Sequence, residues 1–260
     1  MAGEPAVRAV VSDMEGVLHV DWRPLPGSAR AIARLGAAGV PVAVLSNTTG
    51  RSRDEIAVRL EAMGMRVAAG AIVTAVSATA DLVRRRYPSG RVHLLAEPGA
   101  AAEFDGVLLV DDPAEADLVV VGGPHAGWCY PQLNEVFRAV LAGTPMVAMQ
   151  RNRWWPTAAG PAMDAGGFVA ALEYAAGVRA ESVGKPSPEI FRDALTVVGA
   201  EPGDALMVGD DLDSDLRPAA VLGMRTCLVR SGKGSGFQPE PGELTYDVGD
   251  LAELVDRLLS

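Results

Sequence analysis

The sequence of 260 residues predicts an α/β protein with a parallel-sheet core and a second, smaller α/β unit inserted into it. Apolar, β-rich runs alternate along the chain with helical patterns, and this alternation favours a parallel sheet covered by helices on both faces. With 49% hydrophobic and 22% charged residues, the chain also has the make-up of a globular protein with a sizeable core.

The predicted core elements lie at the two ends of the chain. The predicted strands of the core end in, or are followed by, polar or turn-forming residues. They are Val7–Ser12, Val40–Ser46, Ala205–Gly209 and Arg225–Val229. Its helices have apolar residues at helical spacing over 27–39, 52–64 and 187–199. Ser52 and Glu55 form a capping-box pattern, and Ser187-Pro188 is typical of a helix start.

The middle of the chain repeats this alternation. Its predicted strands are Val92–Leu95, Leu118–Val121 and Met146–Met149, and its predicted helices cover 131–142 and 167–176. We therefore expect an inserted domain over residues 71–178, between core segments 1–70 and 179–260.

Charge and composition exclude several classes of function. A net charge of −10 disfavours a nucleic-acid partner, because phosphate backbones are bound by basic surfaces. No apolar run approaches the about 18–20 residues of a membrane span, and the first residues lack a signal-peptide pattern, so we expect a cytoplasmic protein. Cys129 and Cys227 are expected to be reduced and buried. His19, His93 and His125 lack the spacing of a zinc site.

Polar side chains gather where the predicted core strands end. In an open parallel sheet, ligands bind beyond the carboxyl ends of the strands. The residues at these ends, together with one lysine before a helix, are Asp13, Glu15, Ser46, Asn47, Lys185, Asp210, Asp211 and Asp215. An Asp at a strand end is by itself often a turn or helix cap, and GDD, SN or a lysine before proline is a weak signal when taken alone. Together they predict a site in which Mg²⁺ offsets repulsion between carboxylates and a phosphate meets Ser46, Asn47 and Lys185.

Four motifs in this order resemble those of the haloacid dehalogenase superfamily of aspartate-nucleophile phosphatases. They are DMEGV at 13–17, LSN at 45–47, GKPSP at 184–188 and GDDLDSD at 209–215. The long insert between the second and third motifs resembles the type IIA cap of p-nitrophenylphosphatase-like enzymes. The resemblance implies a Rossmann-like core with a cap domain. It also implies a Mg²⁺-dependent phosphohydrolase of a small phosphorylated metabolite. Cap-to-cap dimers occur among such proteins, which makes a homodimer an expectation.

The resemblance also implies roles for the site residues. Asp13 is the nucleophile that forms an aspartyl-phosphate, and Lys185 offsets the charge between nucleophile and phosphate. Ser46 and Asn47 bind the phosphoryl group. The metal ligands are Asp13, Asp210 and the backbone carbonyl of Glu15. Asp211 and Asp215 anchor the metal and Lys185 without being direct metal ligands.

Glu15 departs from the superfamily pattern, which usually has Asp there as the general acid/base. Glu is one methylene longer, and proton transfer needs heavy atoms about 2.6–3.2 Å apart. Three outcomes stay open: Glu15 works in a slightly altered pocket, it turns away and leaves an enzyme that favours good leaving groups, or catalysis is lost and the fold only binds. A phosphotransferase is a further alternative, since a covalent intermediate can pass its phosphoryl group to another acceptor.

The segment 150–168 is the candidate for substrate specificity. Arg153 could meet an anion, and Trp154 and Trp155 could stack on a planar leaving group. The alternative for the tryptophans is packing in the cap core or at a dimer contact. Gly166-Gly167 could admit an anion at a helix start, and a plain turn is the alternative.

Overall fold

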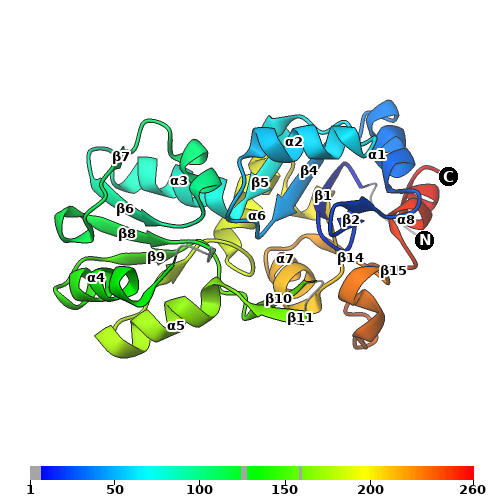
Figure 1. The fold of residues 1–260 in the computed structure, drawn as a ribbon. Coiled ribbons are helices and arrows are strands. Elements are labelled where there is room, and N and C mark those ends of the chain that lie inside the picture. The colour runs from blue at the N-terminus through cyan, green and yellow to red at the C-terminus, as the bar shows by residue number, and fades with distance from the viewer. Residues whose placement is uncertain (1–6, 124–127, 158–159) are drawn as a thin grey trace. The chain divides into compact units, whose positions relative to one another are not determined.

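The structure, a computed structural model, describes residues 7–123, 128–157 and 160–260 (Figure 1). His125 therefore lies outside the described residues. The chain divides into two compact units. The first comprises Met1–Ser46, Arg53–Val73 and Lys185–Ser260, and the second comprises Asn47–Ser52 and Thr74–Gly184. The predicted domain boundaries near residues 71 and 178 stay a proposal.

The first unit is built on a six-stranded sheet of order β15-β14-β13-β1-β4-β5. Its strands are β1 (Ala9–Asp13), β4 (Val42–Ser46), β5 (Ile72–Thr74), β13 (Ala205–Gly209), β14 (Arg225–Val229) and β15 (Tyr246–Val248). Its helices are α1 (Ser28–Ala37), α2 (Arg53–Ala62), α6 (Pro188–Val198), α7 (Arg217–Val221) and α8 (Leu251–Leu258). β1 is central and runs parallel to β13 on one side and β4 on the other, so the carboxyl ends of all three strands meet at one edge.

Burial follows from this arrangement. All five residues of β1 are buried, as a parallel strand covered on both faces requires. One core cluster joins apolar side chains of the sheet, such as Val10 and Val208, to Leu35 of α1 and Leu254 of α8. α1 and α8 pack against each other (Figure 1).

A short hairpin follows β1. Strands β2 (His19–Val20) and β3 (Arg23–Pro24) pair antiparallel, with Asp21 and Trp22 between them. The sequence analysis does not predict this hairpin, because each strand has only two residues.

The second unit contains a five-stranded parallel sheet of order β12-β9-β8-β6-β7. Its strands are β6 (Arg91–Leu95), β7 (Leu108–Leu109), β8 (Leu118–Val121), β9 (Met146–Ala148) and β12 (Glu181–Ser182). Its helices are α3 (Ala75–Arg86), α4 (Tyr130–Leu141) and α5 (Ala165–Ala176), and α4 packs beside α5 (Figure 1). β10 (Trp154–Thr157) and β11 (Gly160–Met163) form a separate antiparallel pair.

Two details differ from the sequence analysis. Cys129 is exposed, and only Cys227 is buried as expected, because Cys129 immediately precedes α4 rather than lying in a strand. Ser187 occupies the N-cap of α6, yet its side chain makes no capping hydrogen bond. Pro188, with its preset backbone angle, follows as the first residue of that helix.

Candidate active site

Asp13 and Lys185 form the centre of the candidate site. Asp13 is the last residue of β1 and is 7% exposed. Lys185 immediately precedes the turn into α6, a helix that packs against β1 and β4. Its Nζ donates to Asp13 Oδ1 at 2.6 Å and lies 2.7 Å from Asp215 Oδ1. A single buried ammonium thus bridges two buried carboxylates.

Asp210 completes a group of three buried acids. One carboxylate oxygen from each of Asp13, Asp210 and Asp215 lies within 4.8 Å of the others. Asp210 immediately follows β13, the parallel neighbour of β1, so the sheet register brings the two carboxylates to the same edge. Asp215 comes from the π-helical turn Leu212–Leu216 that follows.

Burial and mutual repulsion raise the pKa values of these acids. Burial raises the pKa of Asp210 to about 6, and the charge of Asp215 adds to the effect. Burial, with the charge of Asp13, raises the pKa of Asp215 to about 7 although Lys185 opposes it. The pKa of Asp13 is also raised, by burial and by Asp210 against the opposing charge of Lys185. Burial alone would lower the pKa of Lys185, but Asp13 and Asp215 outweigh it and raise that pKa.

This donor set fits a hard divalent cation. Carboxylate oxygens are the ligands that Mg²⁺ and Ca²⁺ prefer. Burial raises the pKa values of Asp210 and Asp215, and repulsion between the acids adds to the effect. A divalent ion bound there would relieve repulsion that Lys185 alone does not offset.

The loop that follows β14 also contributes to the site, although none of its residues is among the predicted site residues. The backbone N–H of Lys233 donates to Asp210 Oδ2 at 2.7 Å. Ser231 Oγ donates to the backbone carbonyl of Gly16 at 2.7 Å. The signal that could have indicated this loop is its position: Ser231 lies just beyond the carboxyl end of β14, at the same edge of the sheet as the acids.

Gly16 allows the close approach of the loop after Asp13 to Asp210. Its φ of +86° lies in the left-handed region, and a Cβ at this position would overlap the Asp210 carboxylate. Gly232 faces the same carboxylate, and a Cβ there would also overlap it. Both positions therefore require glycine for space as well as for conformation.

Asp211 caps the turn that carries Asp215. Its Oδ1 accepts from the backbone N–H groups of Asp213 and Ser214 at 3.0 and 3.1 Å. Its Oδ2 lies 3.2 Å from Lys233 Nζ. Burial would raise the pKa of Asp211, but the hydrogen bond from Ser214 and the charge of Lys233 lower it overall. Asp211 is thus an ionised cap.

Glu15 faces the short hairpin. Its Oε1 accepts from the backbone N–H of Asp21 at 2.8 Å, and its Oε2 lies 3.0 Å from His19 Nδ1. The side chain is 53% exposed. Among the residues that the structure describes, the group of mutually close acids comprises Asp13, Asp210 and Asp215 and leaves Glu15 out.

The remaining phosphate-binding candidates lie where β4 ends. Ser46 is the last residue of β4 and is 5% exposed. Asn47 begins the second unit, and its Nδ2 donates to Asn152 Oδ1 at 3.2 Å. Asn152 therefore orients the Asn47 amide from within that unit.

The specificity candidates occupy the exposed β10–β11 pair of the second unit. Trp154 and Trp155 are 54% and 38% exposed, so they do not form part of the core of that unit. Trp154 pairs with Met163, which is also exposed. Arg153, just before β10, is exposed as well.

Gly166 and Gly167 provide close packing rather than an anion site. A Cβ on Gly166 would overlap the carbonyl oxygens of Arg151 and Asn152, and one on Gly167 would overlap Met163. The backbone N–H of Gly166 already donates to Asn152, and that of Gly167 donates to Asp164.

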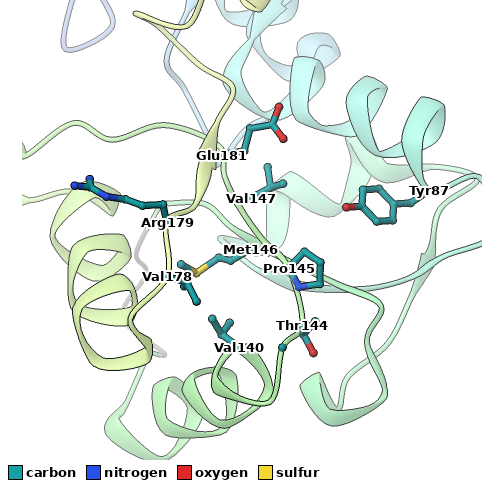
Figure 2. Close-up of a pocket in the computed structure, with 10 residues that line it drawn as sticks. Tyr87, Val140, Thr144, Pro145, Met146, Val147, Val178, Arg179 and Glu181 are labelled. Atoms are coloured by element: carbon teal, nitrogen blue, oxygen red, sulfur yellow. The ribbon is translucent and has the colours of Figure 1, made fainter.

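A pocket of about 290 Å³ lies within the second unit (Figure 2). Tyr87, Thr144, Arg179 and Glu181 are among its lining residues, and none of the predicted site residues lines it. Met146 and Glu181 begin β9 and β12, so the pocket adjoins the amino-terminal ends of these strands. Ligands of parallel sheets usually bind at the opposite, carboxyl ends.

Comparisons with known proteins agree with this geometry. A family model described as haloacid dehalogenase-like hydrolase matches residues 10–109, and a HAD-hydrolase-like model matches residues 182–254. The chain is 35% identical over 262 residues to phospholysine phosphohistidine inorganic pyrophosphate phosphatase of Rattus norvegicus, covering 97% of this chain and 94% of that one. It is also 35% identical to haloacid dehalogenase-like hydrolase domain-containing protein 2 of Mus musculus, covering 100% of this chain and 98% of that protein. A p-nitrophenyl phosphatase from Archaeoglobus fulgidus superposes with a TM-score of 0.89 at 27% identity, covering 97% of this chain and 100% of that one.

The chain therefore belongs to the haloacid dehalogenase-like hydrolase family. Within that family it is a phosphatase. The resemblance given by the four motifs is confirmed, as is the α/β fold class with parallel sheets. No helix among the described residues is both long and apolar enough to span a membrane.

Proposed function

We propose that this protein is a Mg²⁺-dependent phosphohydrolase that acts on a small phosphorylated substrate through an aspartyl-phosphate at Asp13. The observation that supports it best is the buried contact of 2.6 Å between Lys185 Nζ and Asp13 Oδ1. Because Lys185 occupies Oδ1, we assign the attack on phosphorus to Oδ2. The bond from phosphorus to the leaving group breaks as the new bond to Oδ2 forms.

Hydrolysis of the intermediate restores Asp13. A water molecule attacks the phosphorus of the aspartyl-phosphate, the bond to Asp13 breaks, and inorganic phosphate leaves. Ser46 and Asn47 hold the phosphoryl oxygens, and Lys185 offsets the repulsion between a carboxylate and a charged phosphate.

Asp13, Asp210 and the backbone carbonyl of Glu15 would hold the metal ion. When bound, it would supply positive charge for the phosphoryl oxygens. Asp215 is the second carboxylate that holds the Lys185 ammonium, and Asp211 fixes the turn that carries Asp215. Arg153, Trp154 and Trp155 select the substrate.

The names of two similar proteins support a proposal for the natural substrate class. One is named for phospholysine, phosphohistidine and pyrophosphate, and a structural neighbour is named for p-nitrophenyl phosphate. We propose that this chain likewise acts on phosphates with good leaving groups, in the cytoplasm and as a homodimer.

The test is turnover of p-nitrophenyl phosphate with and without Mg²⁺, with Asp13→Asn as the matched control. We expect Mg²⁺-dependent release of nitrophenolate by the wild-type protein and none by the variant. Wild-type turnover no higher than that of Asp13→Asn would contradict the proposal for this substrate class. A panel of pyrophosphate, phosphoramidates and alkyl phosphates then defines the preference. Transfer of phosphate to an added alcohol in place of water would indicate a phosphotransferase.

A further inference from the structure

The hairpin that follows Asp13 has a strained turn. Asp21 and Trp22 connect β2 to β3 with φ angles of +48° and +58°. Two-residue hairpin turns of this left-handed kind favour Asn-Gly or Gly-Gly, because a side chain there is crowded by the backbone. Asp tolerates this conformation better than most residues, whereas a bulky residue such as tryptophan rarely adopts it. Contacts outside the turn must therefore hold it.

Contacts from three side chains hold both residues of this turn. Glu15 Oε1 accepts from the backbone N–H of Asp21 at 2.8 Å. The His19 ring stacks on Trp22 with ring centroids 4.6 Å apart and an angle of 21° between the planes. The Arg59 guanidinium lies 4.8 Å from the centroid of Trp22.

Both oxygens of the Glu15 carboxylate are engaged in this arrangement. Oε2 lies 3.0 Å from Nδ1 of the buried His19 ring, a close contact that lacks the geometry of a hydrogen bond. The same hairpin closes onto the nucleophile loop, since Gly16 N donates to His19 O at 2.8 Å and Leu18 N donates to Met14 O at 2.9 Å. The carboxylate of Glu15 is thus part of the structure that shapes the loop after Asp13.

From these contacts we propose that Glu15 is a positioning residue that holds the strained Asp21-Trp22 turn, and not the acid that protonates the leaving group. To reach a leaving group, its carboxylate would have to give up the Asp21 hydrogen bond. The inference rests on the proposed function, and it narrows the substrate class. Aryl and acyl phosphates, whose leaving groups depart as stable anions, are turned over well. Alkyl phosphates, whose leaving groups need a proton, are turned over poorly.

Three variants separate the two roles of Glu15. In Glu15→Gln, the amide oxygen still accepts from Asp21 N–H, but the side chain no longer donates or accepts a proton in catalysis. Glu15→Ala removes the carboxylate that accepts the Asp21 N–H and holds the turn, a contact that we call the brace. The double variant Glu15→Ala/Asp21→Gly removes the brace and also places at position 21 a residue that adopts the left-handed conformation without strain. Glu61→Gln, at an exposed acid of α2, controls for the loss of one negative charge.

The readouts are kcat and KM for p-nitrophenyl phosphate and for an alkyl phosphate, and hydrogen exchange at the Asp21 amide. Glu15→Gln keeps the backbone carbonyl that is assigned to the metal site and changes only the side chain, so we expect it to stay within about threefold of wild type on both substrates. Glu15→Ala should lose protection of the Asp21 amide and about tenfold in kcat, the equivalent of one hydrogen bond. The double variant should recover most of that kcat, which loss of an acid catalyst would not allow.

The opposite pattern would overturn the proposal. If Glu15 is the acid, Glu15→Gln and Glu15→Ala both lose about 10²–10⁴-fold on the alkyl phosphate, and one limb of the pH–rate profile disappears. Unchanged protection of the Asp21 amide in Glu15→Ala would equally refute the brace. Failure of the proposed function has a separate signature, in which wild-type turnover equals that of Asp13→Asn. The exchange measurement tests the brace even then.

Discussion

Replacing Asp210 by Asn should make the metal-free protein more stable at neutral pH, although it removes a predicted metal ligand. Burial and the Asp215 charge raise the pKa of Asp210 to about 6 from an ordinary 3.8. A difference of this size corresponds to about 3 kcal/mol of unfolding free energy lost when the carboxylate ionises. The neutral amide of Asn avoids this penalty, but it accepts the Lys233 N–H less strongly, at a cost of about 1 kcal/mol.

The sign of the pH dependence follows from the raised pKa. The folded protein holds the Asp210 proton more tightly than the unfolded chain does, so stability declines as pH rises from about 4 to 6. At pH 7.5 the penalty is complete, and Asp210→Asn should be about 2 kcal/mol more stable, or roughly 4–8 °C higher in Tm. At pH 4.5 the penalty is only about 1 kcal/mol, so the advantage should vanish.

The assay is thermal and urea unfolding of both proteins at the two pH values, in EDTA and then with Mg²⁺. Mg²⁺ should stabilise the wild type, by about 2.7 kcal/mol at a hundred times its Kd, and the variant much less. The gap should therefore close or reverse when the ion is added. Equal destabilisation of Asp210→Asn at both pH values in EDTA, or equal stabilisation of both proteins by Mg²⁺, would refute the reasoning.

Three further substitutions test the parts around this cluster. Lys185→Met leaves buried carboxylates without their cation, so stability should fall by about 3–5 kcal/mol and kcat by about 10²–10³-fold; a kcat within threefold of wild type would contradict this. Gly16→Ala forces a Cβ onto Asp210, so the protein should lose about 1–3 kcal/mol of unfolding free energy and should no longer be stabilised by Mg²⁺. The control is Gly36→Ala on α1, where a Cβ meets nothing within 4 Å, and this substitution should be neutral or stabilising. Trp154→Ala should raise KM for p-nitrophenyl phosphate more than for pyrophosphate and leave Tm unchanged, because the ring is 54% exposed; equal KM effects would argue against stacking.

The core of the site could be predicted because parallel strands impose its geometry. β13 and β14 have the bounds that the apolar runs indicated, and β4 ends at the predicted Ser46. Once these runs are parallel neighbours of β1, residues at their carboxyl ends must approach one another. A local pattern thus determines a contact between residues almost 200 positions apart, such as Asp13 and Asp210.

The other features of the site depend on tertiary contacts, which leave no pattern in the local sequence. Ser231 and Lys233 lie in a glycine-rich loop, and its contacts with Gly16 and Asp210 follow only from where β14 ends. The orientation of Glu15 is of the same kind. Its spacing from Asp13 indicates proximity to the phosphate, but its rotamer is decided by the Asp21 N–H, in a turn whose Asp-Trp sequence is atypical of hairpins.

Charge balance explains why such an unfavourable cluster is compatible with a folded protein. Three ionised carboxylates and one ammonium carry a net charge of −2 in a buried volume. A divalent cation compensates this charge, whereas protonation near neutral pH, as the pKa values of about 6 and 7 show, compensates it only in part. A phosphate ester entering next would bring about two negative charges back. Lys185, the only basic side chain paired with Asp13 in the described part of the chain, would then face both the Asp13 carboxylate and the phosphate. The acids that destabilise the metal-free protein would therefore make the proposed site depend on the ion, and this would link the stability of the fold to readiness for catalysis.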